Sequence, residues 1–210
     1  MASILTFDEL NSEDNRLGNI KAYEKYFSVM NLTESEIQER VDLATEFDKE
    51  FRGFFMLAIS MLFLEKDLDR DALYNLAYSS YIDLLERYGY SSDLAREHAS
   101  MICQEIVDTT IASQNLSNER LMSISRNEAN SICNCQRDIR MMNLGYKYKK
   151  WITNVDGHER YTHGAAHGQI VDIGKPFWIG NSQMMYPMDT SLNAEAQEII
   201  NCRCKCDYFR

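Results

Sequence analysis

The hydrophobic periodicity of the chain changes at Gly145. From Leu17 to about Leu144, apolar residues recur at three- and four-residue steps with polar faces between them. This pattern predicts amphipathic helices, each with one face to bury. The spacing is no longer helical after Gly145, and six of the nine glycines lie from that residue onward. The sequence therefore predicts an α+β protein, in which an N-terminal helical bundle (1–144) precedes a small C-terminal α+β module (145–210).

Five or six helices are expected in the bundle, the last of which is long and connects to the module. Thr33 and Glu36 form a capping-box pattern that predicts the start of one helix. Gly53 is expected to kink that helix or to separate it from the apolar segment that follows. Further helices are predicted over residues 68–88, 92–112 and 117–144. The last of these should bury Leu121, Ile124, Ile132, Ile139 and Met142.

Strands are predicted only in the C-terminal module. Tyr146–Thr153 alternates aromatic and cationic residues, a pattern typical of a half-buried strand. Two further strands are expected at Gln169–Val171 and Cys202–Tyr208. Large aromatic residues dominate small cores, so the core of the module is predicted to contain Trp151, Phe177 and Trp178.

Charge and hydropathy narrow the classes of partner. The net charge is −10, with 12 more acidic than basic residues in 1–116 and two more basic than acidic residues in 117–210. An acidic front half repels phosphate backbones, whereas the back half tolerates nearby DNA. The longest apolar run, 54–64, is shorter than the roughly 20 residues that cross a bilayer, so no membrane contact is predicted. The N-terminus lacks a basic segment followed by a long apolar one, so we expect the protein to stay in the cytosol.

The six cysteines are crowded rather than evenly spaced. Cys103 stands alone, whereas the other five occur two residues apart, in a pair and a triplet. That spacing is unlike a disulfide framework, so reduced thiols are expected, with metal binding as the alternative. The five clustered cysteines are Cys133, Cys135, Cys202, Cys204 and Cys206.

Asp156, Arg160, His163 and His167 follow one another at steps of four, three and four. One interpretation is structural: Arg160 makes a bidentate pair with Asp156 or another carboxylate and fixes a loop. The other is a zinc site formed by two histidines and two cysteines. Its members would be His163, His167, Cys202 and Cys204. On a flat strand the thiols of a Cys-x-Cys pair lie about 6.6 Å apart, so a bulge or turn would be needed to bring them onto one ion.

A catalytic interpretation would use His163 as general base, Asp156 or Glu159 to orient it, and Arg160 to stabilise an anion. The chain has no Gly-x-Ser-x-Gly elbow, no His-Glu-x-x-His motif and no phosphate-binding glycine loop. No nucleophile is marked by any such motif. We therefore predict that the protein is not an enzyme.

The last third carries a fixed order of residues. They are Lys150-Trp151, Asp156, Arg160, His163, Gly168, Phe177, Tyr186-Pro187, Asp189 and Asn201-Cys202-Arg203-Cys204. From about Ile124 to Cys204, the chain resembles the C-terminal domain of the phage Mu F-like minor head proteins, also called the phage head morphogenesis family. Arg126-Asn127-Glu128 is similar to the family's Arg-Thr-Glu stretch, with Asn127 in place of Thr. The position of His167 is variable in that family, so the resemblance supports His163 and the cysteine pair but not a fourth ligand.

The resemblance implies a minor capsid protein of a tailed phage or prophage, which takes part in head assembly near the portal and in DNA packaging or delivery. Its partners would be the portal or other head proteins, with packaged DNA near the C-terminal module. The protein would occupy the host cytoplasm during assembly and then the head of the virion. The alternative is a small metal-dependent effector or nucleic-acid-processing enzyme that uses His163 and Cys202/Cys204. The structural constellation would comprise Trp151, Asp156, Arg160, His163, Asn201, Cys202 and Cys204.

Overall fold

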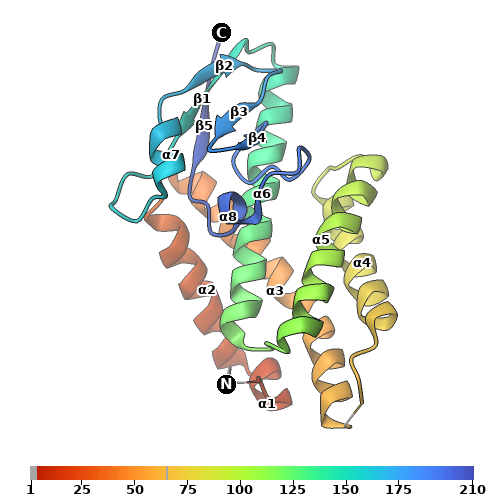
Figure 1. The fold of residues 1–210 in the computed structure, drawn as a ribbon. Coiled ribbons are helices and arrows are strands. Elements are labelled where there is room, and N and C mark those ends of the chain that lie inside the picture. The colour runs from red at the N-terminus through yellow and green to blue at the C-terminus, as the bar shows by residue number, and fades with distance from the viewer. Residues whose placement is uncertain (1–3, 65) are drawn as a thin grey trace. The chain divides into compact units, whose positions relative to one another are not determined.

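The computed structural model describes residues 4–64 and 66–210 (Figure 1). Six helices come first, and short strands and helices follow, so the protein has the expected α+β fold with a helical N-terminal region. The first six helices are α1 (Phe7–Asn11), α2 (Glu13–Ser28), α3 (Glu34–Phe63), α4 (Arg70–Arg87), α5 (Ser92–Ser113) and α6 (Asn118–Asn143). The later elements are β1 (Tyr148–Ile152), α7 (Tyr161–Ala166), β2 (Ile170–Asp172), β3 (Phe177–Ile179), β4 (Ser182–Met184), α8 (Ala196–Ile199) and β5 (Lys205–Phe209).

The chain forms two compact units that differ from the predicted division at residues 144 and 145. Unit 1 comprises Met1–Tyr23 and Asp42–Ser125. Unit 2 comprises Glu24–Val41 and Arg126–Arg210. The C-terminal part of α6 therefore belongs with the strands, together with the end of α2 and the beginning of α3.

Helix α3 begins as the capping-box pattern predicts. The backbone N–H of Thr33 donates to Glu36 Oε2 at 2.8 Å, and the N–H of Glu36 donates to Thr33 Oγ1 at 3.3 Å. The alternative that Gly53 separates this helix from the apolar segment is wrong, because α3 continues to Phe63. The kink at Gly53 stays a prediction. A Cβ atom at Gly53 would meet nothing within 4 Å, so no close contact demands glycine there.

Unit 1 has an aromatic core with a polar network inside it. Phe47 and Phe51 stack with their ring centroids 5.9 Å apart, and both rings contact Tyr81. The buried Asp48 accepts hydrogen bonds from Arg52 Nε at 2.6 Å and from the Tyr23 hydroxyl at 2.8 Å. These bonds offset the cost of burying the charges. In the part of the chain that the structure describes, no helix has both the length and the apolar character needed to span a membrane.

Unit 2 contains two small antiparallel sheets. The first has the order β2-β1-β5, with Trp151 opposite Cys206 and Lys149 opposite Tyr208. The second is the β3–β4 hairpin, which turns at Gly180 (φ 59°). Strands β1 and β2 lie where the sequence predicts them, whereas the hairpin was not predicted. The strand predicted from Cys202 begins only at Lys205.

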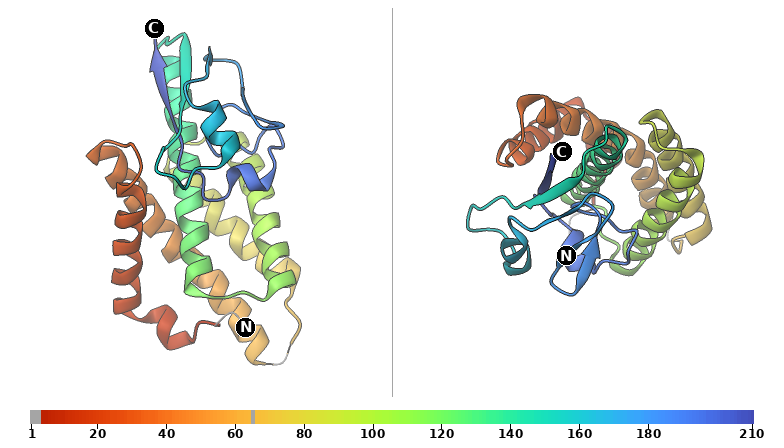
Figure 2. Two further views of the ribbon diagram at one scale, coloured as in Figure 1. Left: turned by 60° about the vertical axis from the view of Figure 1, so that its left-hand side comes forward. Right: turned by 90° about the horizontal axis from the view of Figure 1, so that it is seen from above.

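The buried part of α6 within unit 2 mixes polar and apolar side chains, and β1 and β5 lie alongside this part of the helix (Figure 2). Asn130 donates to the Cys202 carbonyl oxygen at 3.0 Å, and Ser131 and Asn134 donate to backbone carbonyls near residue 188. The prediction that Ile139 and Met142 are buried is wrong, since 42% and 43% of their surfaces are exposed. Apolar periodicity failed there because polar residues at four-residue steps, Asn130, Asn134 and Asp138, lie on the buried face.

Candidate metal centre

Three ligand-type side chains of unit 2 converge in a buried cluster. His163 Nδ1 lies 3.3 Å from Cys204 Sγ and 3.6 Å from Cys202 Sγ. One ligand atom from each of the three residues lies within 4.8 Å of the other two. Each of the three residues is at most 2% exposed. The sequence predicts this association across about 40 residues, and the structure brings these three together.

The backbone around the cysteines explains how their thiols approach each other. Both residues precede β5 and follow the short helix α8, so neither lies on a flat strand. Asn201 has a left-handed conformation (φ 57°), and the Cys202 N–H donates to the Ile199 carbonyl oxygen at 3.0 Å. Because residues 202–204 lie outside any strand, the thiol separation of a flat strand does not apply to this pair.

His163 is positioned from several sides. It lies in α7, and its carbonyl oxygen accepts a hydrogen bond from Thr153 Oγ1 at 2.6 Å. Its other ring nitrogen, Nε2, is buried and lies 3.0 Å from Glu198 Oε2. This contact has the distance of an ion pair but not the angle of a hydrogen bond. Thr162 Oγ1 donates to the same Glu198 oxygen at 2.8 Å, which fixes the carboxylate beside the imidazole.

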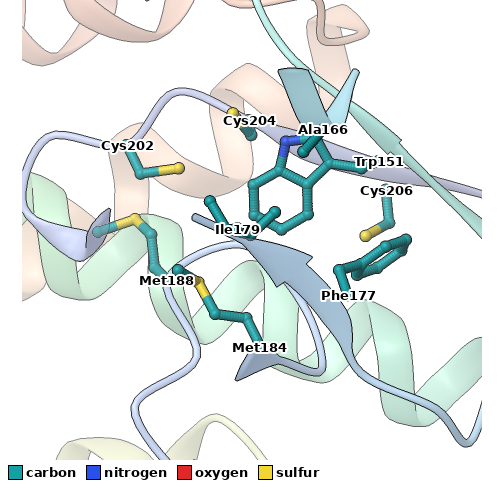
Figure 3. Packing of buried hydrophobic residues seen from close by; sticks show 9 residues of the cluster. All are labelled: Trp151, Ala166, Phe177, Ile179, Met184, Met188, Cys202, Cys204 and Cys206. Carbon is teal, nitrogen blue, oxygen red and sulfur yellow. The ribbon is translucent and has the colours of Figure 1, made fainter. Parts of the chain in front are cut away.

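The cluster borders the hydrophobic core of unit 2. Figure 3 shows Trp151 in the middle of this core, between Cys204 and Phe177. The indole packs edge-on against the rings of His163 and Phe177, with centroid separations of 5.8 Å and 5.4 Å. Trp151 and Phe177 are buried as predicted, but Trp178 is 58% exposed because alternate residues of β3 face opposite sides. On this side, buried apolar side chains therefore cover the imidazole and the thiols.

The two thiols differ in their proton affinity. A hydrogen bond from Cys202, followed by the contact with His163, lowers the pKa of Cys204 below its ordinary value. Burial, followed by the neighbouring Cys204 sulfur, raises the pKa of Cys202 well above its ordinary value. The pair therefore favours one thiolate beside one thiol. A thiolate next to an imidazole is suited either to metal ligation or to nucleophilic attack.

A pocket of about 250 Å³ opens beside the cluster, and Cys204 and His163 form part of its wall. Three arginines, Arg126, Arg160 and Arg203, also line it. The Arg126 guanidinium lies over the Tyr26 ring, 4.7 Å from its centroid, and its Nε is buried without a hydrogen-bond partner. The pocket therefore combines thiol and imidazole groups with an excess of positive charge.

Two sequence-based assignments around this pocket are corrected. Arg160 does not pair with Asp156; it is half-buried and donates to the Ile200 carbonyl oxygen. Asp156 instead accepts two hydrogen bonds from Arg203, at the rim of the pocket. Asp156 and Arg160 do not share a helical face, because only α7, from Tyr161 to Ala166, is helical there.

His167, the fourth ligand in the sequence-based zinc set, lies outside the cluster of three. Its Nδ1 accepts a hydrogen bond from the Thr153 backbone N–H at 3.1 Å. Asn201 accepts from Arg126 at 2.9 Å, and its own N–H donates to Asn127 Oδ1 at 3.1 Å. The stretch of α6 that resembles the family's Arg-Thr-Glu segment thus holds the residue just before the cysteines.

A buried ion pair of unit 2 escaped sequence reasoning. Lys149 Nζ lies 3.3 Å from both carboxylate oxygens of Asp138 and donates to the Met185 carbonyl oxygen at 2.6 Å. The Tyr208 hydroxyl donates to Asp138 at 3.1 Å. One signal was present in the sequence: Lys149 lies two residues before Trp151, so both must face the same side of β1. Glu198 was missed as well, since nothing near it in the sequence marks it as buried.

None of the six cysteines forms a disulfide bond in the described structure, and all six are buried. Burial raises the pKa of Cys133 to about 12, so this thiol stays protonated at neutral pH. Comparison with protein-family models, with curated proteins and with solved structures finds no match for this chain.

Proposed function

We propose that the protein is a minor head protein of a tailed phage or prophage, acting in head assembly near the portal. The observation that carries the proposal is the convergence of the residues on which the family resemblance rests. Trp151, His163, Asn201, Cys202 and Cys204 are spread over more than 50 positions of the chain, yet they meet around one core and one pocket. If the chain shares the family's fold, the residues that carry the resemblance should meet in one site, as these do.

The contacts of these residues favour an assembly role over turnover. Arg160 holds the Ile200 carbonyl oxygen, and Arg126 and Asn127 hold Asn201. Such side chains fix the backbone between α8 and β5. A minor head protein needs a stable surface for binding its partners and requires no chemical step.

The charge distribution favours a protein partner for the front of the chain. Residues 1–116 contain 12 more acidic than basic residues, which disfavours contact with the DNA backbone. The portal or another head protein is the partner proposed for that segment. Packaged DNA is proposed to lie nearer the residues after 117, where basic residues are in slight excess.

The test is to follow the full-length protein through particle assembly. A tagged copy would be expressed in the lysogen that encodes it, and proheads and mature heads would be purified after induction. Mass spectrometry should detect the chain in these particles, and affinity purification should recover the portal with it. A chain that is absent from both kinds of particle and recovers no head protein would contradict the proposal.

A metal-dependent enzyme acting on nucleic acid is the second candidate. It is favoured by the pocket, where His163 and Cys204 lie near three arginines. Nuclease activity of the purified protein, measured beside His163→Ala, is the matching test. Activity that survives the substitution would remove His163 from any active site.

A further inference from the structure

We propose that His163, Cys202 and Cys204 bind one divalent ion of the zinc class and leave a fourth coordination position open to the arginine-lined pocket. The ligand for that position is water or a small phosphate-like anion. This inference does not depend on the role in head assembly. It follows from the distances, the burial and the surroundings of the three side chains.

The distances suit a tetrahedral ion. Bonds of about 2.3 Å to sulfur and about 2.0 Å to nitrogen place neighbouring ligand atoms about 3.5–3.8 Å apart. The Nδ1–Sγ separations of 3.3 Å to Cys204 and 3.6 Å to Cys202 lie close to that range. An ion could therefore be accepted with small side-chain adjustments. In residues 4–64 and 66–210, no other three metal-binding side chains converge in this way.

The outer partner of the histidine has the arrangement common in metal sites. A metal-binding imidazole usually turns its second nitrogen to a carboxylate, which fixes the ring and makes it a better ligand. Here Nδ1 faces the thiols, and Nε2 faces Glu198 Oε2 at 3.0 Å. Nε2 makes no well-aligned hydrogen bond in the structure. A small rotation of the ring toward a bound ion would allow Nε2–H to donate an aligned hydrogen bond to Glu198.

Within residues 4–64 and 66–210, no fourth histidine, cysteine or carboxylate joins the three ligands. His167 lies outside the cluster, and Cys206 is in the β-sheet opposite Trp151. Three protein ligands with one open position are the arrangement of reactive rather than purely structural zinc sites. The pocket beside Cys204 and His163 is lined by three arginines and one carboxylate, Glu159. Arg203 is already paired with Asp156, and the excess of positive charge that remains favours an anion there. Its volume of about 250 Å³ admits a group the size of phosphate.

The first test is the metal content of the full-length protein, purified with a reductant and without chelator. We expect one zinc ion per chain in the wild type and in two matched controls, Cys206→Ala and His167→Gln. Cys202→Ser and Cys204→Ser should lose the ion. Glu198→Gln should keep the fold and weaken zinc affinity about 10–100-fold, as expected for an outer-sphere partner.

The second test addresses the open position, with cobalt in place of zinc. Thiolate-to-cobalt charge transfer should appear in the wild type and disappear in Cys204→Ser. Addition of inorganic phosphate should shift the visible cobalt bands. A short single-stranded oligonucleotide, titrated on the same scale of total phosphate concentration, distinguishes polymer-borne from free phosphate. If the site prefers a polymer, the oligonucleotide should shift the bands at a lower phosphate concentration than inorganic phosphate does.

Several outcomes would overturn the inference. Wild-type protein that is folded by circular dichroism but binds neither zinc nor cobalt removes the metal site. Stoichiometric alkylation of Cys204 in such metal-free protein would assign the cluster to thiol chemistry instead. Loss of zinc in His167→Gln as complete as in Cys204→Ser would restore a four-ligand centre. Cobalt bands that ignore phosphate would show that the fourth position is closed.

Discussion

Replacing Lys149 by methionine tests whether the buried ion pair holds unit 2 together. The Lys149 side chain is fully buried, and its ammonium group is matched by the Asp138 carboxylate and the Met185 carbonyl oxygen. Methionine fills a similar volume but leaves the Asp138 charge buried and unpaired. Removing one partner of a buried pair costs about 3–5 kcal/mol of folding free energy. We expect a loss of that size for Lys149→Met.

The assay is urea unfolding followed by tryptophan fluorescence. Both tryptophans, Trp151 and Trp178, lie in unit 2, so the signal reports on that unit. Lys147→Met is the matched control, because Lys147 is exposed and just outside β1. It should change the free energy of unfolding by no more than about 0.5 kcal/mol. Equal losses for the two variants would refute the reasoning.

A double-mutant cycle separates the pair from simple packing. Adding Asp138→Leu to Lys149→Met removes the stranded carboxylate, so the double variant should recover most of the stability that the single variant lost. The Tyr208 hydroxyl then loses its acceptor, which limits the recovery. If the losses of the two single variants simply add, the two side chains do not interact.

The pH dependence has a defined sign. Burial raises the pKa of Asp138 above its ordinary value, although Lys149 and Tyr208 oppose this shift. A carboxyl whose pKa is raised in the folded state stabilises the fold most below its unfolded value, near 3.9, and less as pH rises through the folded pKa. The stability advantage of the wild type over Asp138→Asn should therefore shrink from pH 4 to pH 7, measured by thermal unfolding. A growing advantage would contradict the sign.

Three further substitutions have defined outcomes. Gly180→Ala should lower the free energy of unfolding in urea by about 1–2 kcal/mol, because φ is +59° and an added Cβ would lie 3.0 Å from a side-chain methyl group of α7. The control Gly174→Ala should be near neutral. Asn201→Ala should cost about 1–2 kcal/mol, and Asn201→Gly less, because glycine keeps the left-handed backbone. Asp156→Asn should lower the thermal midpoint slightly at neutral pH, because hydrogen bonds from Arg203 lower the pKa of Asp156. The difference in midpoint between wild type and variant should vanish on acidification through that pKa.

Local signals in the sequence were read correctly where short-range chemistry determines the structure. Thr33 and Glu36 cap α3 because both partners lie within one turn of the chain. Gly53 does not separate two helices, because the propensity of one glycine is small beside the packing of a 30-residue helix. The three-residue strands β3 and β4 are too short to show a clear alternation, so the hairpin was missed.

Long-range contacts were predictable only where residue type restricted the partners. His163, Cys202 and Cys204 were associated because imidazole and thiol groups have few alternative uses. Glu198 and Lys149 gave no such signal, because charged residues of these types are usually at the surface. Their partners lie 36 and 11 positions away, and no local pattern identifies these partners.

The geometry of the candidate metal centre depends on residues that precede the predicted module. Asn130 of α6 donates to the Cys202 carbonyl oxygen at 3.0 Å, and Asn130 Oδ1 accepts from the buried Arg40 at 2.8 Å. Arg40 lies in the part of α3 that belongs to unit 2, so the position of Cys202 is determined by two helices as well as by the turn at Asn201. Residues 145–210 alone lack these helical partners and would leave buried polar groups without hydrogen bonds. The smallest segment that preserves the site must therefore include the helices that carry Arg40 and Asn130.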